Sequence, residues 1–496
     1  MPETPPLRTE ALLCQSDERL RQHAAAVFAR ALVGDVEGTA VDWGGLDLGD
    51  DAGWIGDLFA PGIRAIGDVH TAIDSGELSC VDIVQGFLRR IERYDQSSGM
   101  NSVIFTNPNA LEKAQLIDER ITAGISLGPL YCIPVLLKDN FDTGDMPTSG
   151  GSIALKESTP PDDAFMVRKL READAIIIAK TNMAEWAFSA RQSVSSSFDT
   201  TRNAYALDRV PAGSSGGTAS GVAASLGLIG LGSDTGNSIR GPSSHLALVG
   251  IRSTIGLTSR DGVIPLSFDR DIAGPMGRTV VDVAKVFDVV VGYDPADSYT
   301  ELGRGRREDD YTSFLDSDGL NGKTIGVLRA LVDPEEADTA IVRVFEEAIV
   351  DLRRLGADVL DPFEFDVSAQ LEREGMFCQR FRYDMWTYLK SLGQDAPISD
   401  VLEVLEDGRY SDYVESTLRR NENAPLDVHP SEWEEPCLDY AENVARQAYL
   451  TTLVKAMDAA GVDALVYPSW TCIPAPIERG NEEYCGDNSQ LIAPAT

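Results

Sequence analysis

Histidine and paired cysteines are scarce in this chain of 496 residues. It has only four histidines, and its seven cysteines are scattered without a CxxC pair. Zinc sites draw on clustered cysteine and histidine ligands, so we predict no metal site. The odd number and wide spacing of the cysteines favour reduced thiols, which are typical of a cytosolic protein.

Positive charge and long apolar runs are also lacking. The 43 lysines and arginines against 79 acidic residues give a net charge of −36, which repels the phosphates of nucleic acids and anionic lipids. We expect neither as a partner. No run of 18 apolar residues occurs, and the N-terminus lacks a basic stretch followed by an apolar one, so we expect no membrane span, no signal peptide and a cytoplasmic location. The acidity fits a saline cytosol and an ordinary acidic protein equally well.

Residues 1–60 form an acidic segment that ends in a turn-prone, Gly- and Asp-rich stretch. One helix is predicted in it, at residues 17–32. We interpret the segment as a surface extension ahead of one domain, residues 61–496. Its use as a dimer arm, and hence a homodimer, is the alternative.

The rest of the chain alternates short apolar segments with helical patterns. Strands are predicted at 134–137, 175–179, 228–232, 324–328, 358–360 and 464–467, and helices at 165–172, 217–226, 338–355 and 432–460. This alternation predicts an α/β fold, with one large, mixed, twisted sheet covered by helices on both faces. Residues 367–430 are predicted to be a helical, aromatic-bearing insert.

Two clusters of glycine and serine lie close together, at Gly213–Gly217 and Gly232–Ser238. Glycines allow backbone N–H groups to gather around a small polar centre, and serines supply hydroxyls there. A nucleophilic serine needs a proton acceptor and an oxyanion hole, and such loops provide both. GSSGG lacks the Lys-Ser/Thr ending of a P-loop, so we expect no nucleotide and no other cofactor.

This pattern resembles the amidase signature family, most closely its stand-alone bacterial and fungal amidases. Residues 133–140 are similar to the family's lysine strand, and Lys138, Ser214 and Ser238 follow in the family's order and spacing. Further similar motifs lie at 239–242, 249–254 and 274–280. The resemblance runs from about residue 66 to the last residue and implies the family's fold and a Ser-Ser-Lys site.

The resemblance implies a role for each of these residues. Ser238 is the expected nucleophile, and Ser214, after a cis peptide bond, is expected to relay protons to a neutral Lys138. Burial can lower a lysine pKa far enough for that. The expected oxyanion-hole amides are those of Thr235, Gly236, Asn237 and Ser238. Ser215 is expected as a second partner of Lys138, and Asp234 and Arg240 as a brace or an ordinary buried salt bridge.

Other readings of the same residues are open. Ser238 could simply cap a helix, and Lys138 could pair with Asp139. His245 could serve as a serine base, although a packed or capping histidine is the simpler reading. Many family members have glycine in place of Asn237, whose side chain is expected to narrow the leaving-group side of the pocket.

The implied activity is hydrolysis of a carboxamide, and also of an ester or carbamate, through an acyl-enzyme. The substrate is then a small-molecule amide, and the aromatic insert at 367–430 is expected to cap the site and favour apolar or aromatic groups. The alternatives are a glutaminase-like component of a tRNA amidotransferase, corresponding to its A subunit, or an inactive paralogue that acts as a partner. The chain stops before an expected core strand, so we also expect truncation and an unpaired sheet edge beside residues 464–467.

Overall fold

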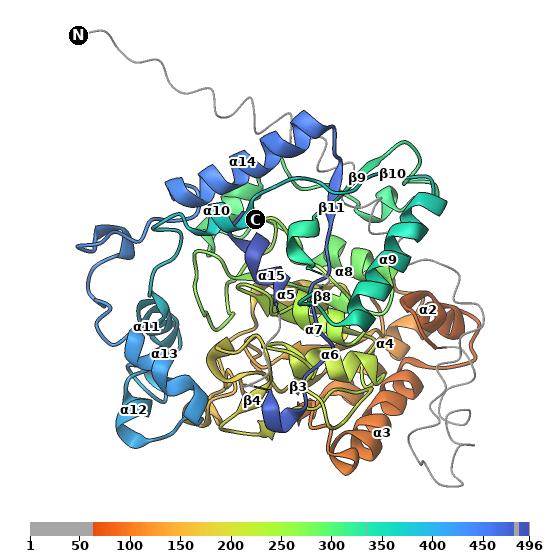
Figure 1. Ribbon diagram of the computed structural model, residues 1–496. Helices are drawn as coiled ribbons and strands as arrows, with labels where there is room; N and C mark the ends of the chain where they lie inside the picture. Colours follow the sequence, from red (N-terminus) through yellow and green to blue (C-terminus); the bar gives the residue numbers. More distant parts are fainter. Residues whose placement is uncertain (1–62, 334, 481–485, 496) are drawn as a thin grey trace, which may run out of the picture.

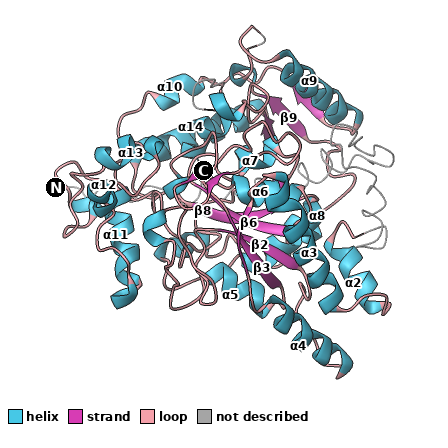
Figure 2. Ribbon diagram, turned by 90° about the horizontal axis from the view of Figure 1, so that it is seen from below, coloured by secondary structure: helices cyan, strands magenta, loops and turns pink. Residues whose placement is uncertain are grey.

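The computed structural model describes residues 63–333, 335–480 and 486–495. The extension predicted at residues 1–60 and its helix lie outside the described residues. A six-stranded sheet runs through the molecule, and helices cover it (Figures 1 and 2). In the described ranges no helix is both long and apolar enough to cross a lipid bilayer.

The six-stranded sheet is mixed, as predicted. Its central strand β2 is parallel to β3 and β6, and the outer strands β1, β8 and β7 pair antiparallel with their neighbours. β2, β3 and β6 are buried along their whole length, which explains their continuous apolar character. In spatial order the strands are β1 (Val103–Thr106), β3 (Ile176–Thr181), β2 (Pro134–Lys138), β6 (Ile229–Asp234), β8 (Ile272–Gly277) and β7 (Val249–Gly250).

Helices pack on both faces of this sheet. A Cβ on Gly230 would meet Thr218 and Val222 of α6, whereas one on Gly277, opposite Ile229, would meet Val283 of α8. Neighbouring residues of a strand point to opposite faces, so α6 and α8 cover different faces. The helices of this part are α2 (Ile66–Asp74), α3 (Cys80–Ser98), α4 (Ala110–Thr122), α5 (Phe165–Glu172), α6 (Gly216–Ala223), α7 (Arg240–His245) and α8 (Val280–Val290); β4 (Val194–Ser195) and β5 (Asp199–Thr200) form a hairpin.

The later strands do not join the main sheet, so that part of the prediction was wrong. β9 (Thr324–Val327) pairs in parallel with β10 (Asp358–Leu360) and β11 (Ala464–Val466) in a separate three-stranded sheet. Separate apolar clusters against α9 (Thr339–Arg354) and α14 (Val444–Ala460) stabilise it. β11 is an outer strand of this sheet, and the predicted truncation and unpaired edge stay predictions. Completion of this edge by further residues or a partner stays a prediction.

The insert at 367–430 is helical, as predicted, and its helices α11, α12 and α13 lie together at the lower left of Figure 1. Its helices are α10 (Val367–Leu371), α11 (Phe381–Ser391), α12 (Glu403–Asp407) and α13 (Glu415–Arg420). The helix predicted from residue 432 begins only at Val444, after the Asn443 cap. Pro436 lacks the N–H that a helix interior needs, so it disfavours a helix that runs through this position. The last helix is α15 (Asn488–Ile492).

The cysteines contradict the prediction of reduced thiols. Cys80 is bonded to Cys132, Cys378 is bonded to Cys437, and Cys472 is also in a disulfide. Sequence spacing could not show these pairs, because the partners are brought together only by the fold. The predicted cytoplasmic location loses the thiol argument on which it partly rested.

Reduction is expected to destabilise the protein. The two fully described bridges close chain segments with separations of 52 and 59 residues. Loss of each is expected to lower the free energy of unfolding by about 2–5 kcal/mol. Chemical denaturation with and without dithiothreitol measures this, with Cys80→Ser/Cys132→Ser as the matched variant. If a thiol reagent detects all seven cysteines as free thiols in denatured protein without a reductant, the disulfides are absent.

Candidate active site

The site lies where β2 and β6 end. These two strands are adjacent and parallel, so their carboxyl ends meet at the same edge of the sheet. β2 ends in Lys138, and β6 leads into the loop Thr235–Ser238, which is followed by α7. The segment that leads into α6 completes the site with Ser214, after a cis Gly213–Ser214 bond that confirms the predicted one.

Lys138 is fully buried and hydrogen-bonded to serines. Its Nζ lies 2.7 Å from Ser214 Oγ, 2.8 Å from Ser233 Oγ and 3.3 Å from the Ser233 carbonyl oxygen. Burial lowers the pKa of Lys138 to about 7. The ammonium therefore loses its proton near neutral pH, so this lysine can serve as a base.

The second partner of Lys138 differs from the prediction. It is Ser233 and not Ser215, whose Oγ donates to the Ser233 carbonyl at 3.3 Å. Asn140 Nδ2 also donates to Ser233 Oγ, at 2.9 Å. The alternative pairing of Lys138 with Asp139 does not occur, because Asp139 accepts hydrogen bonds from Ser149 and from the Gly151 N–H.

Gly213 allows the chain to pass close to a neighbouring loop. A Cβ at this position would lie 2.4 Å from the Gln192 carbonyl oxygen and 2.5 Å from that of Ser189. Both are backbone atoms that cannot rotate away, so any side chain here would displace Ser214. The first glycine of the GSSGG cluster is thereby explained by packing.

The loop that carries Ser238 leaves four backbone donors available. The Ser238 carbonyl oxygen accepts from the Ser215 N–H at 3.3 Å, which places Ser238 beside the Ser214–Ser215 segment. Across the described ranges, the N–H groups of Thr235, Gly236, Asn237 and Ser238 donate to no protein acceptor. Such free, closely spaced amides are the donors that an oxyanion hole requires.

A buried ion network braces the start of this loop. Asp234 pairs with Arg240 at 3.2 Å, as predicted, and with Arg252 at 3.2 Å, which sequence reasoning left without a role. Burial alone would raise the pKa of Asp234, but the two guanidinium groups hold it well below its ordinary value. The Thr235 hydroxyl donates to Asp271, a second contact that the sequence did not reveal.

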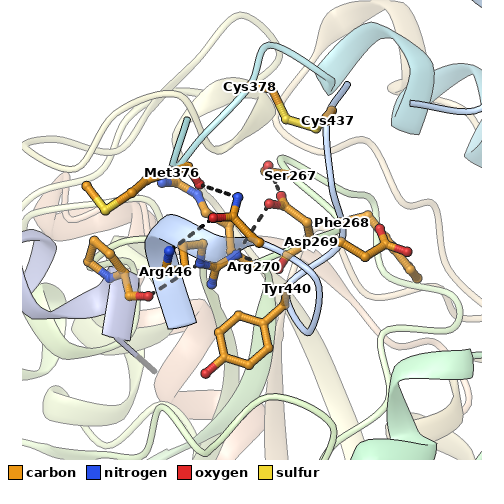
Figure 3. A network of polar contacts seen from close by, with 12 residues as sticks. Ser267, Phe268, Asp269, Arg270, Met376, Cys378, Cys437, Tyr440 and Arg446 are labelled. Carbon is orange, nitrogen blue, oxygen red and sulfur yellow. Dashed lines mark hydrogen bonds and ion pairs between the residues drawn. A yellow bond between two sulfur atoms is a disulfide. The ribbon is translucent and has the colours of Figure 1, made fainter. Parts of the chain in front are cut away.

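A second network supports the segment ahead of β8, which carries Asp271 (Figure 3). Arg446 Nη1 donates to the Asp269 carbonyl oxygen at 3.0 Å, and its guanidinium lies 4.5 Å from the centre of the Tyr440 ring. Arg270 stacks on Phe377, 4.0 Å from the ring centre. The nearby Cys378–Cys437 bridge ties this part of the insert to the segment ahead of α14.

Two further side chains near Ser238 pack against other parts of the protein. Asn237 turns toward Asp487, 2.7 Å away, and a Cβ on Gly241 would lie 2.4 Å from its amide nitrogen. It therefore packs against the protein, and the predicted narrowing of the pocket stays unsupported. His245 stacks on Trp470, and burial lowers its pKa to about 4. It is a packed histidine, as the simpler reading expected.

The helical insert contacts the loops that follow β2 and β3. Tyr388 of α11 donates to Asp142 at 2.8 Å, and the Tyr413 hydroxyl accepts from the Glu185 N–H at 2.7 Å. Burial raises the pKa of Asp142 to about 8, so this carboxyl is protonated over part of the neutral range. The insert is thus anchored beside the edge of the sheet where the site lies.

The described residues hold no group of three His, Cys, Asp or Glu side chains placed to bind a metal ion. The prediction of a metal-free and cofactor-free site stays a prediction. The available groups are hydroxyls, amides and one lysine of lowered pKa, which suit acyl transfer.

Curated relatives of this chain include the same subunit of one enzyme from several organisms. The chain is 37% identical to the A subunit of the glutamyl-tRNA(Gln) amidotransferase from Microcystis aeruginosa, over 66% of this chain and 63% of that protein. It is 40% identical to the corresponding protein from Symbiobacterium thermophilum, over 58% of this chain and 57% of that protein. The matches thus span less than two thirds of those relatives.

Solved structures match more of the chain. Peptide amidase from Stenotrophomonas maltophilia is 33% identical, with a TM-score of 0.76, over 87% of this chain and 88% of that one. An amidase family protein from Bacillus anthracis is 28% identical, with a TM-score of 0.74, over 97% and 88%. The sequence also matches the Amidase family over residues 82–494. This chain therefore belongs to the amidase signature family.

Proposed function

We propose that the chain hydrolyses carboxamide bonds through an acyl-enzyme on Ser238, with Ser214 and Lys138 as proton carriers. The observation that carries the proposal is the 2.7 Å contact between Lys138 Nζ and Ser214 Oγ in a buried site. A lysine with a pKa of about 7 is a competent base at neutral pH. Ser214 is also next in the chain to Ser215, whose N–H donates to the Ser238 carbonyl oxygen.

In the first half of the proposed reaction, Ser238 Oγ attacks the amide carbonyl carbon. Its proton passes through the Ser214 hydroxyl to neutral Lys138. The negative charge on the carbonyl oxygen is received by the amides of Gly236, Asn237 and Ser238, and the fourth predicted donor is Thr235. When the C–N bond breaks, the proton returns through Ser214 to the leaving nitrogen.

In the second half, water takes the place of the amine. It attacks the Ser238 ester while a proton again moves to Lys138, and collapse of the intermediate releases the acid and restores the Ser238 hydroxyl. No other reactant is needed. Esters and carbamates follow the same course, because they present the same carbonyl to the same donors.

We propose a small apolar or aromatic amide as substrate and a stand-alone enzyme. The insert beside the site carries many aromatic side chains, and peptide amidase matches most of this chain. The second candidate is a glutaminase that works as one component of an amidotransferase, which the curated relatives favour. A homodimer and a cytoplasmic location belong to the same proposal; light scattering and cell fractionation test them.

The two candidates differ in what the purified chain hydrolyses alone. We expect it to release amines from aryl amides and ammonia from aliphatic amides without a partner. Glutamine turnover that exceeds all other amides, or appears only with partner subunits, would favour the second candidate. No turnover of amides, esters or carbamates, and no labelling of Ser238 by a fluorophosphonate, would indicate the inactive paralogue.

A further inference from the structure

The C-terminal segment Gly486–Ala495 lies against the loop that carries Ser238. Asp487 Oδ2 accepts from Asn237 Nδ2 at 2.7 Å, and both side chains are buried. The same carboxylate accepts from Ser489 Oγ and from Gln490 Nε2, both at 2.6 Å. Three donors fix the orientation of one carboxylate, so its position is set by its own segment.

A second contact joins the same two segments. Arg240 donates through Nη2 to the Gly236 carbonyl oxygen at 2.6 Å and through Nη1 to the Ser489 carbonyl oxygen at 2.9 Å. Gln490 also packs on the loop, since a Cβ on Gly236 would lie 3.5 Å from its side chain. The peptide unit between Gly236 and Asn237 is therefore linked through Arg240 to the C-terminal segment.

The Asn237 side chain is closely packed, in addition to its hydrogen bond with Asp487. Its amide lies so close to Gly241 that a Cβ there would be 2.4 Å from Nδ2. Its Oδ1 is buried and, among the residues that the structure describes, has no hydrogen-bond partner. Among the described residues, the bond to Asp487 is thus the hydrogen bond that orients this side chain.

We propose that Asp487 is a positioning residue for the oxyanion hole. Through Asn237 it fixes the direction of the Gly236, Asn237 and Ser238 amides. This proposal rests on the proposed function, in which those amides receive the negative charge of the tetrahedral intermediate. A glycine in place of Asn237 could not make this contact, so this chain fixes the loop with a side-chain pair.

The test compares a transition-state analogue with a ground-state ligand. Phenylboronic acid forms a tetrahedral adduct with a nucleophilic serine, whereas benzoate does not. Misplaced amides are expected to weaken boronate binding in Asp487→Ala about 10- to 100-fold and to lower kcat similarly, with little change in KM or benzoate binding. Asn237→Ala removes the same bond but leaves the contacts of Asp487 with Ser489 and Gln490, so it should show the same loss.

A swap of the two side chains tests the hydrogen bond itself. Asn237→Asp/Asp487→Asn restores one donor and one acceptor, whereas Asn237→Asp alone places two carboxylates together. We expect the double variant to bind boronate more tightly than Asn237→Asp. Tyr449→Phe is the control, because it removes a 2.8 Å bond to the Leu491 carbonyl oxygen of the same segment without touching the loop.

The outcomes separate the two proposals. Wild-type boronate affinity that survives Ser238→Ala would overturn the proposed function. Loss of affinity in Ser238→Ala, but wild-type affinity in folded Asn237→Ala and Asp487→Ala, would overturn the role of Asp487 alone. Equal weakening of benzoate and boronate, or equal losses in Tyr449→Phe, would show a general structural effect and also refute the positioning role.

Discussion

Replacement of Ser238 by alanine is expected to lower kcat for amides by about five to six orders of magnitude, as loss of a nucleophile does in serine hydrolases. The variant would keep the amides of the loop but have no oxygen to form the acyl-enzyme. Residual turnover should then reflect binding and polarisation of the carbonyl only. Amine release under substrate saturation measures the effect.

The fold should survive this change. Ser238 is buried, and its backbone carbonyl keeps its bond to the Ser215 N–H in the variant. We expect the free energy of unfolding to change by less than about 1 kcal/mol. Ser97→Ala, on the exposed surface of α3, is the matched control. More than a trace of wild-type activity in a folded Ser238→Ala protein would assign the nucleophile elsewhere.

Loss of the lysine is expected to be the next largest effect. Lys138→Ala should lower amide turnover about 100- to 10,000-fold, the usual contribution of general acid–base catalysis. The loss should be smaller for a matched ester, because an alkoxide leaves without the proton that an amine requires. Equal losses on both substrates would contradict the role of Lys138. Lys113→Ala, on the surface of α4, is the control.

The pH profile gives a second test of the lysine. In the proposed mechanism the active form is neutral Lys138, so kcat/KM should rise with pH through about 7 and then stay level, and this rise should vanish in Lys138→Ala. Lys180, whose pKa burial lowers to about 8, donates to the Phe141 carbonyl oxygen and to Thr148 Oγ1 and is held apart from Ser214. A rise in kcat/KM near pH 7 that persists in Lys138→Ala would show that another group, such as Lys180, is responsible for it.

The sequence predicted those parts of the molecule that depend on local pattern. The strands β2, β3 and β6 are buried on both faces. Such strands have continuous apolar sequences, so they can be recognised without a structure. The glycine and serine clusters likewise indicated the loops that place Ser214 and Ser238. The separate sheet of β9, β10 and β11 was missed because an apolar strand does not reveal which sheet it joins.

The missed contacts of the site are those between distant segments. Ser233 was overlooked as the partner of Lys138 although it lies within a recognised cluster, because only the direction of its side chain distinguishes it from Ser215. Arg252 and Asp271 meet the loop from elsewhere in the chain. The disulfides were missed for the same reason, since the spacing of Cys80 and Cys132 carries no signal of their proximity.

The distances along the chain also determine when the site is completed during synthesis. Lys138 and Ser214 are 76 residues apart, whereas Asn237 and Asp487 are 250 apart, and Arg240 and Ser489 are 249 apart. A growing polypeptide therefore contains Lys138, Ser214 and Ser238 long before Asp487 and Ser489 have left the ribosome. Hydrolytic activity is accordingly expected only after the C-terminal segment has been synthesised, and an incomplete chain is expected to be inactive.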